Sequence, residues 1–314
     1  MAGLSRDRQD VATTPGYRVA AVVLSWNGRD ETLRCLASLA DVVHFPLSVI
    51  VVDNGSVDGS PDAVADSFPE VVLVRLSRNS GFSGGVNTGI ATALESGADA
   101  VLLLNNDMVV QPGFLAPLIR AIADDPLAAA ACSQILFADP PHHVWYAGAS
   151  YNPRRGHQGR NIGFGGERLP PDTPPYAVDC ACGGAMLIPR EALEGVGIFD
   201  EELFAYREDL DWSLRAREQG RRVLVAPASV VEHRVSASSG GESSPTSLYY
   251  DTRNGLVVAD RQAPLPRLPG LLRSAEWVLA HAIQALLSRR RLEGLRAVRD
   301  GWRDARKGRL GQRP

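Results

Sequence analysis

The stretch Val101-Leu102-Leu103-Leu104-Asn105-Asn106-Asp107 passes from purely apolar to polar side chains within one residue. A short apolar run of this kind is typical of a strand buried on both faces of a sheet, and ligands of such sheets bind beyond the carboxyl ends of the strands. Aspartate and asparagine oxygens at that edge can ligate a hard divalent cation, whereas the same residues elsewhere are ordinary turn and cap residues. The stretch therefore predicts a buried strand that ends in a candidate site.

Residues 18–135 repeat this pattern of short apolar runs between helical stretches. We predict strands over 19–24, 49–52, 71–76, 101–104 and 128–135, and helices over 30–39, 60–67, 84–96 and 112–124. This alternation predicts an α/β fold with a mostly parallel nucleotide-binding sheet flanked by helices. Four polar strand ends should then meet at one edge of the sheet: Ser25-Trp26-Asn27, Asp53-Asn54-Gly55-Ser56, Arg78-Asn79-Ser80-Gly81 and Asn105-Asn106-Asp107.

Two of these strand ends allow both plain and functional interpretations. Asp53-Asn54-Gly55-Ser56 is a good tight turn, but a carboxylate there could also accept the imide N–H of a uracil or thymine ring. The glycine-rich stretch 79–85 resembles a phosphate-binding loop at a helix N-terminus, yet it has neither a P-loop lysine nor a GxGxxG pattern. Neither stretch identifies a ligand by itself.

A second acidic signature, Glu208-Asp209-Leu210-Asp211, lies among aromatic residues before a predicted helix over 210–220 and a strand over 222–226. Carboxylates at a helix start are favoured by the helix dipole and need no function. The functional interpretation makes Asp209 a general base that deprotonates a hydroxyl nucleophile. His233 could likewise be an ordinary strand-end histidine or complete a metal or diphosphate site.

Composition narrows the classes of protein. The chain has 314 residues, 45% of them hydrophobic, and a net charge of −3, yet residues 261–314 hold 13 Lys and Arg against 4 Asp and Glu. An acidic body with a basic tail argues against a nucleic-acid binder, although the tail could meet an anionic surface. Four cysteines make no disulfide framework, and neither a signal peptide nor a membrane-length apolar run is present. We therefore expect a cytoplasmic protein whose membrane contact is at most peripheral.

Three segments lie outside the alternating pattern. Residues 137–176, rich in Pro, Gly, Arg and His, predict a long surface excursion, and residues 236–247 predict a flexible Ser/Gly-rich loop. Beyond Gly270 a leucine-rich stripe recurs at helical spacing, followed by Arg289-Arg290-Arg291. We favour a helix whose stripe docks on the core over a helix that lies on the membrane interface.

The order of the motifs resembles that of family two glycosyltransferases with a GT-A fold, particularly the bacterial rhamnosyltransferase-like branch. The resemblance extends over about residues 18–260, and several ordered matches are more specific than any single one. The matching stretches are Val22-Val23-Leu24-Ser25-Trp26-Asn27, Val51-Val52-Asp53-Asn54-Gly55-Ser56, residues 79–89, Leu104-Asn105-Asn106-Asp107, Gly197-Ile198-Phe199-Asp200-Glu201, residues 206–215 and Tyr249-Tyr250-Asp251-Thr252-Arg253-Asn254.

The resemblance implies an inverting glycosyltransferase and a role for each matching residue. Ser25, Asn27 and Asp53 would hold the nucleoside of a nucleoside-diphosphate sugar, and Asn79, Gly81 and Phe82 would border its ribose and diphosphate. Asn105 and Asn106 would also bind the nucleotide sugar. Asp107, with His233, would bind a Mg²⁺ or Mn²⁺ ion and the diphosphate. Asp209 would be the base, with Glu208 as a second catalytic residue, and Arg253 would meet a diphosphate or an anionic acceptor. Because Asn105 replaces the first Asp of the DxD pattern of the wider family, the expected metal affinity is weaker.

The resemblance also implies a domain division and an acceptor. A flexible N-terminus (1–17) would precede a GT-A domain, in which 18–135 bind the donor and 136–260 bind the acceptor, and a basic amphipathic helical extension (261–314). The acceptor would be a hydroxyl of a glycan, a lipid-linked sugar or a small molecule, rhamnose being one candidate donor sugar. Two alternatives stay open, a sugar-phosphate nucleotidyltransferase and a non-catalytic module that binds nucleotide sugars.

Overall fold

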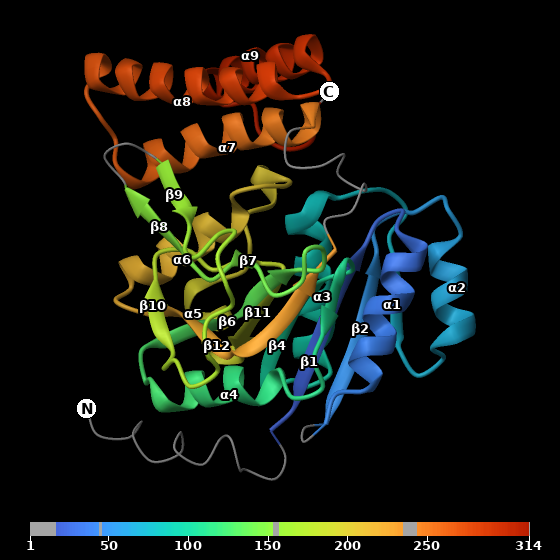
Figure 1. Ribbon diagram of the computed structural model, residues 1–314. Helices are drawn as coiled ribbons and strands as arrows, with labels where there is room; N and C mark the ends of the chain where they lie inside the picture. Colours follow the sequence, from blue (N-terminus) through green and yellow to red (C-terminus); the bar gives the residue numbers. More distant parts are fainter. Residues whose placement is uncertain (1–16, 44–45, 153–156, 235–243, 314) are drawn as a thin grey trace.

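A ten-stranded mixed sheet forms the centre of the computed structural model, which describes residues 17–43, 46–152, 157–234 and 244–313 (Figure 1). One half of the sheet is parallel and has the order β3-β2-β1-β4. Its strands are β1 (Val19–Ser25), β2 (Leu47–Asp53), β3 (Val72–Arg75) and β4 (Ala100–Asn105). Val22, Val51 and Leu103 are inaccessible to solvent, as expected for apolar runs buried on both faces.

The other half of the sheet is mixed. An antiparallel strand, β11 (Ala185–Pro189), separates β4 from β6 (Ala128–Phe137), and β12 (Arg222–His233) then runs parallel to β6. Three short strands complete the sheet at its margins: β10 (Tyr176–Val178) and β5 (Met108–Val110) pair with β12, and β7 (Val144–Tyr146) pairs with β6. A separate hairpin is formed by β8 (Ala149–Asn152) and β9 (His157–Asn161).

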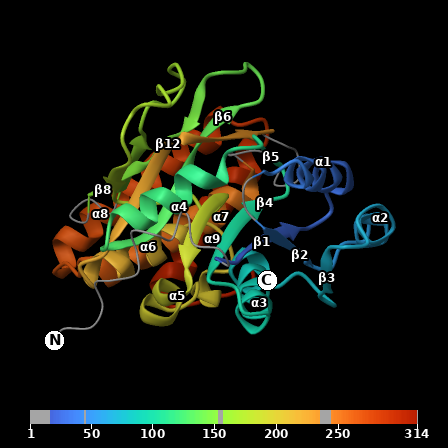
Figure 2. The same cartoon turned by 90° about the horizontal axis from the view of Figure 1, so that it is seen from below.

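Helices cover both faces of the sheet (Figure 2). On one side lie α1 (Arg29–Ala40) and α4 (Leu115–Asp124), with α2 (Ser60–Ser67) beside α1; on the other side lie α3 (Gly81–Glu95), α5 (Arg190–Val196) and α6 (Glu208–Glu218). The α/β sheet with flanking helices is thus confirmed, and the carboxyl ends of its parallel strands meet at one edge as predicted.

Three local predictions are corrected. The stretch 79–85 is not an open glycine-rich loop, because α3 already begins at Gly81. The strand predicted over 222–226 continues to His233, since a second apolar run pairs with the end of β6. The predicted excursion over 137–176 contains β7 and β8, whose residues Val144 and Tyr146 are buried. The N-terminus through residue 16 and most of the Ser/Gly-rich loop (235–243) lie outside the described residues.

Three further helices stack beyond the carboxyl ends of the strands (Figure 1). They are α7 (Pro245–Gln262), α8 (Arg267–Leu287) and α9 (Arg291–Lys307), with α7 nearest the sheet. Among the described residues, no helix is long and apolar enough to cross a membrane.

The leucine stripe of α8 does not dock on the core, contrary to our expectation. The face that packs inward carries Arg273, Trp277, His281 and Ala285. Arg273 and His281 have carboxylate partners on α7, Asp260 and Asp251, and the Trp277 ring packs against Gly255 of the same helix. The leucines at intervening positions are exposed, for example Leu272 (64%) and Leu279 (62%).

Candidate active site

The ends of β1 and β2 form the first wall of the site. Ser25 and Asp53 are register partners and are 1% and 4% exposed. The Ser25 hydroxyl lies 2.9 Å from the Thr32 hydroxyl, which fixes it to the start of α1. Asn27, with φ of 49°, accepts a hydrogen bond from the Val57 amide (2.9 Å) and so joins the loops after both strands. The residues assigned to the nucleoside therefore lie together.

Asn54 joins this wall to the start of α3, a role that sequence reasoning missed. Its amide nitrogen donates to the Gly81 carbonyl (2.9 Å) and to Asn79 Oδ1 (3.2 Å), and its Oδ1 accepts from the Ser80 amide (2.8 Å). The signal available in the sequence was only its place in a turn beside Asp53. Asn54 positions the segment that carries Asn79, Gly81 and Phe82.

The end of β4 forms the second wall. Asn106 donates to the Thr32 hydroxyl (2.9 Å), and the Asn105 amide donates to the Gly184 carbonyl (3.0 Å). Asp107 Oδ2 lies 3.2 Å from His233 Nε2, because β5 pairs with the last residues of β12. The predicted partners Asp107 and His233 are thus brought together across 126 positions of sequence.

The Asp107–His233 pair offers two buried polar atoms that a divalent metal could use. Asp107 Oδ1 and His233 Nδ1 are buried, and neither has a hydrogen-bond partner in the described part of the chain. The described residues contain no group of three or more His, Cys, Asp or Glu that could hold a metal alone. A Mg²⁺ or Mn²⁺ ion at this pair would therefore complete its coordination with oxygens of the bound diphosphate, as Mg²⁺ commonly does.

Glu208 and Asp209 occupy the first turn of α6, where unequal surroundings separate their properties. Burial, together with the charge of Asp209, raises the pKa of Glu208 to about 8, and Glu208 Oε2 has no partner among the described residues. Burial also raises the pKa of Asp209, but the amides of Gly183 (3.2 Å) and Leu210 (2.8 Å) donate to it and favour its charged form. Asp209 is therefore the stronger candidate for a base.

Two glycines bring Asp209 to the donor side of the site. A Cβ atom on Gly183 would lie 3.5 Å both from Asp209 Cβ and from the Phe82 ring, and one on Gly184 would lie 3.2 Å from Asn105 Nδ2. The start of α3, the end of β4 and the start of α6 therefore converge on Gly183-Gly184. Sequence reasoning did not single out this pair, and its only signal was two adjacent glycines before an apolar run.

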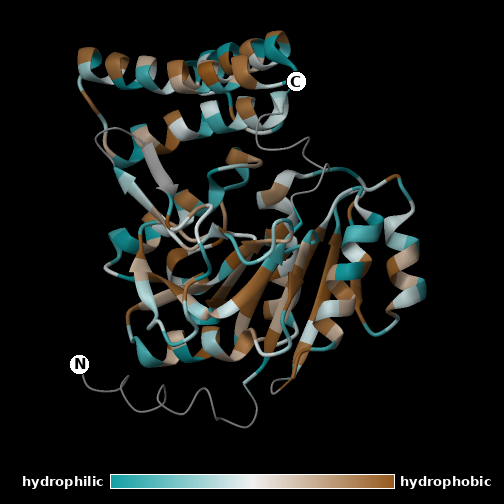
Figure 3. Cartoon of the chain, in the orientation of Figure 1, coloured by the Kyte–Doolittle hydropathy of each residue, from teal (hydrophilic) through white to brown (hydrophobic). Residues whose placement is uncertain are grey.

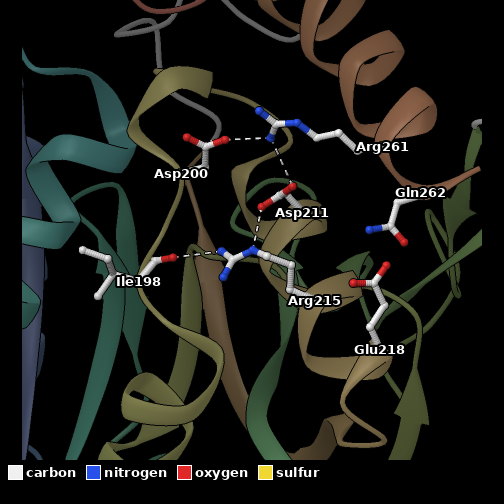
Figure 4. A pocket seen from close by; sticks show the side chains of 7 residues that line it. All are labelled: Ile198, Asp200, Asp211, Arg215, Glu218, Arg261 and Gln262. Carbon is white, nitrogen blue, oxygen red and sulfur yellow. Dashed lines mark hydrogen bonds and ion pairs between the residues drawn. The ribbon is translucent and has the colours of Figure 1, made fainter. Parts of the chain in front are cut away.

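Asp211, the third carboxylate of the acidic signature, faces elsewhere. It pairs with Arg215 (2.9 Å) and lies 3.6 Å from Arg261, in a hollow that Asp200 also lines (Figure 4). Arg261 pairs with Asp200 at 2.7 Å, so these charges are satisfied within the protein. Asp211 therefore links α6 to α7 through Arg261.

Arg253 does not lie free for a phosphate. It is 1% exposed, and its guanidinium donates to the carbonyls of Gly311 (2.7 Å) and Leu203 (2.9 Å) and to Asn254 Oδ1 (2.8 Å). The expected contact with a diphosphate or acceptor is therefore corrected to a structural one. The matching motif was recognised, but nothing in it distinguished a buried cation from an exposed one.

The segment before Asp209 is strained and braced by α7 and α8. Phe204, Tyr206 and Arg207 all have positive φ (65°, 67° and 72°), which is unfavourable for side chains of this kind. Asn254 Nδ2 donates to the carbonyls of Leu203 (2.8 Å), Ala205 (2.8 Å) and Tyr206 (2.7 Å).

A charged network completes this brace. Arg207 forms a bidentate pair with Asp251, whose Oδ2 also lies 2.9 Å from His281 Nε2 on α8. Burial acts to raise the pKa of Asp251, but Arg207 and His281 hold it well below its usual range. The C-terminal helices thus fix the conformation of the segment that leads to Asp209, and sequence reasoning did not predict this role.

Comparison with known proteins identifies the family. Residues 20–197 match the family described as glycosyl transferase family 2, which is more than half of the chain. The chain belongs to this family. The matched region contains the ends of β1, β2 and β4 and stops before Asp209. The family assignment therefore rests on the N-terminal part of the site. This membership favours glycosyl transfer over the nucleotidyltransferase alternative.

Relatives of similar length support the assignment. The glycosyltransferase is 30% identical over 269 residues to an N-acetylglucosaminyl-diphospho-decaprenol L-rhamnosyltransferase of Mycobacterium tuberculosis, covering 79% of this chain and 86% of the relative. It is 24% identical to the dTDP-rhamnosyl transferase RfbF of Shigella flexneri, covering 91% and 98%. The chain is thus rhamnosyltransferase-like.

Solved structures show the same fold. GalNAc-T7, solved with UDP, GalNAc and Mn²⁺, has a TM-score of 0.59 at 18% identity, over 78% of this chain and 48% of that one. The mannosyltransferase PcManGT of Pyrobaculum calidifontis, solved with GDP-Man and Mn²⁺, has a TM-score of 0.54 at 19% identity, over 98% and 82%. The expected GT-A architecture is therefore confirmed.

Proposed function

We propose that this glycosyltransferase transfers rhamnose from dTDP-rhamnose to a hydroxyl of a polyprenyl-diphosphate-linked sugar, with inversion at the anomeric carbon. The two rhamnosyl transferase relatives support the donor, and the decaprenol-linked acceptor of the mycobacterial relative supports the acceptor class. The observation that carries the proposal is the convergence of Asp209 and the β4 end on Gly183-Gly184. A lipid-linked acceptor would make the cytoplasmic face of a membrane the working location.

The donor would lie against the two walls. Asp53 accepts only long hydrogen bonds from the Ser56 amide (3.3 and 3.4 Å), so its oxygens retain capacity for the imide N–H of thymine. Ser25 and Asn27 would contact the same nucleoside, and the segment held by Asn54 would border the diphosphate. A Mg²⁺ or Mn²⁺ ion at Asp107 and His233 would neutralise charge on the departing diphosphate.

The transfer itself needs a base and a clear approach. Asp209 takes the proton of the acceptor hydroxyl while the acceptor oxygen attacks the anomeric carbon from the face opposite the diphosphate. The bond between that carbon and the diphosphate oxygen breaks, so nucleoside diphosphate leaves and the configuration inverts. Glu208, held neutral by its surroundings, adds no second negative charge beside the base.

The test measures donor binding and turnover separately. Thermal stabilisation by dTDP-rhamnose, UDP-GlcNAc or GDP-mannose reports donor binding, and release of nucleoside diphosphate reports transfer to acceptor or water. We expect dTDP-rhamnose to stabilise best, Asp209→Asn to keep that stabilisation while losing at least about 100-fold in turnover, and Asp107→Ala to lose the Mn²⁺ enhancement. Asp66→Asn, an exposed carboxylate on α2, is the matched control.

Three results would each reject one part of the proposal. Equal or greater stabilisation by another nucleotide sugar would reject the rhamnose donor while leaving glycosyl transfer intact. Full turnover by Asp209→Asn would remove the base assignment, and turnover unchanged by EDTA would show that Asp107 and His233 act without a metal.

A further inference from the structure

The helix α8 is inverted relative to an ordinary surface helix. Its inward face carries Arg273, Trp277 and His281, which are 4%, 4% and 6% exposed, while its leucines point outward. Ordinary amphipathic helices bury the apolar stripe and expose the polar one. Half of the exposed large apolar side chains in the described residues lie within 268–292. We call the outward residues Leu268, Leu271, Leu272, Leu279, Ile283, Leu286 and Leu287 the α8 leucine face.

The helix cannot rotate to exchange its inward and outward faces without cost, because the polar groups of the inward face form hydrogen bonds and ion pairs. Arg273 pairs with Asp260 and donates to the Ala263 carbonyl (2.8 Å), and His281 lies 2.9 Å from Asp251. Turning α8 to bury its leucines would leave these groups without partners, at a cost of about 1–3 kcal/mol each. The leucine face is therefore a stable feature of the fold.

Positive charge borders this face at both ends. Arg267 begins α8, and Arg289, Arg290 and Arg291 follow its last turn, all of them exposed. Glu276 is the one acidic residue within α8; it is exposed and lies within the leucine face, four positions after Leu272 and three before Leu279. Beside α8, in the same outer layer, α9 adds exposed Leu292 and Arg296 (Figures 1 and 3).

We propose that the α8 leucine face, with the arginines at its ends, docks on an anionic phospholipid bilayer, with α8 lying in the plane of the interface. An apolar face bordered by arginines fits the acyl boundary and the anionic headgroups above it. No described helix could span the bilayer, so the contact is peripheral. The inference deepens the proposed function, since it rests on it for a lipid-linked acceptor, but its evidence lies on the C-terminal helices and not on the donor residues.

The placement also suits the chemistry. Figure 1 shows the C-terminal helices beyond the carboxyl ends of the parallel strands, the end at which the donor residues gather. Docking through α8 would thus bring that end of the enzyme towards the bilayer, where the diphosphate of a lipid-linked acceptor lies.

The test is co-sedimentation of the full chain with vesicles of phosphatidylcholine alone or of equal parts phosphatidylcholine and phosphatidylglycerol, without donor or acceptor. We expect binding to the anionic vesicles only. The L279S/I283S variant should bind at least about tenfold more weakly, and neutralising Arg289 and Arg291 to Gln should cost about fivefold per charge. Leu127→Ser, at another exposed apolar position (46%) away from α8, should bind as the native chain does.

Each contrary outcome is distinct. A chain that stays in solution with anionic vesicles, or an L279S/I283S variant that binds normally, would overturn the proposal. A dimer in solution that L279S/I283S converts to a monomer, with no vesicle binding by either, would assign the face to a second copy instead. Thermal stabilisation by dTDP-rhamnose is measured without vesicles, so failure of the donor assignment would be recognised separately.

Discussion

Replacing Asn254 by alanine should loosen the segment that carries the base. The side-chain nitrogen has two hydrogens shared among three carbonyls, at 2.8, 2.8 and 2.7 Å. The Leu203 carbonyl keeps a second donor, Arg253 Nη2, but those of Ala205 and Tyr206 lose this one. The Arg253 Nε–H also loses its acceptor, Asn254 Oδ1. At about 1–2 kcal/mol for each of three buried hydrogen bonds, we expect the free energy of unfolding to fall by about 3–6 kcal/mol.

The same change should slow turnover. Because Tyr206 and Arg207 are held at positive φ only by their surroundings, relaxation of this segment would move the start of α6 and with it Asp209. A displacement near 1 Å can cost about 100-fold, so we expect kcat to fall at least about tenfold, with the donor KM unchanged.

The assay combines thermal unfolding with steady-state kinetics of Asn254→Ala and Asn254→Asp. The aspartate variant keeps the shape but directs an acceptor oxygen at carbonyls, so it should be the less stable of the two. Gln262→Ala removes an amide from the end of the same helix and should match the native enzyme. Native-like stability and kcat in both Asn254 variants would refute the bracing argument.

The remaining predictions concern the neighbouring carboxyls of Glu208 and Asp209 and the start of α3 at Gly81. The pKa of Glu208 is raised to about 8 in the folded state, above its unfolded value, so its contribution to stability is present at acid pH and lost as pH rises towards 8. As pH rises towards 8, Glu208→Gln should therefore gain stability relative to the native enzyme by up to about 1.4 kcal/mol per pH unit. Melting temperatures of the two proteins that change in parallel with pH would contradict this prediction. Gly81→Ala should cost stability and donor binding, because its Cβ would lie 2.3 Å from the Phe204 carbonyl oxygen. Gly59→Ala has a similar φ (79°) but no neighbour within 4 Å, so equal losses in both variants would attribute the effect to backbone conformation alone. The rate should also fall as pH drops through the raised pKa of Asp209, and Asp209→Asn, measured by residual hydrolysis, should lose that dependence.

The donor half of the site was readable from sequence because local patterns determine it. Apolar runs ending in Asn27, Asp53 or Asp107 place those residues at one sheet edge once the strands are parallel, and parallel pairing follows from the helices between them. The Asp107–His233 contact was also predicted, although the strand that leads to His233 was predicted to end at residue 226.

The catalytic half was less readable because it depends on contacts between distant segments. Nothing local to Arg253 distinguishes a buried cation bonded to carbonyls from an exposed one awaiting phosphate. The stripe on α8 has the spacing of a docking face, but which face packs was decided by Asp251 and Asp260 on another helix. Periodicity identifies an amphipathic helix without telling which side meets the protein.

A single carbonyl oxygen has a consequence for how this enzyme can vary. The Phe204 oxygen accepts from the Ser83 amide (3.2 Å) and lies 2.3 Å from the position that a Cβ on Gly81 would take, so α3 and the segment before Asp209 meet at this point. Evolution could alter the specificity for the donor through residues on either side of that point, but not through the point itself. A change there would move both segments, so we expect it to alter the kinetics of donor and acceptor together.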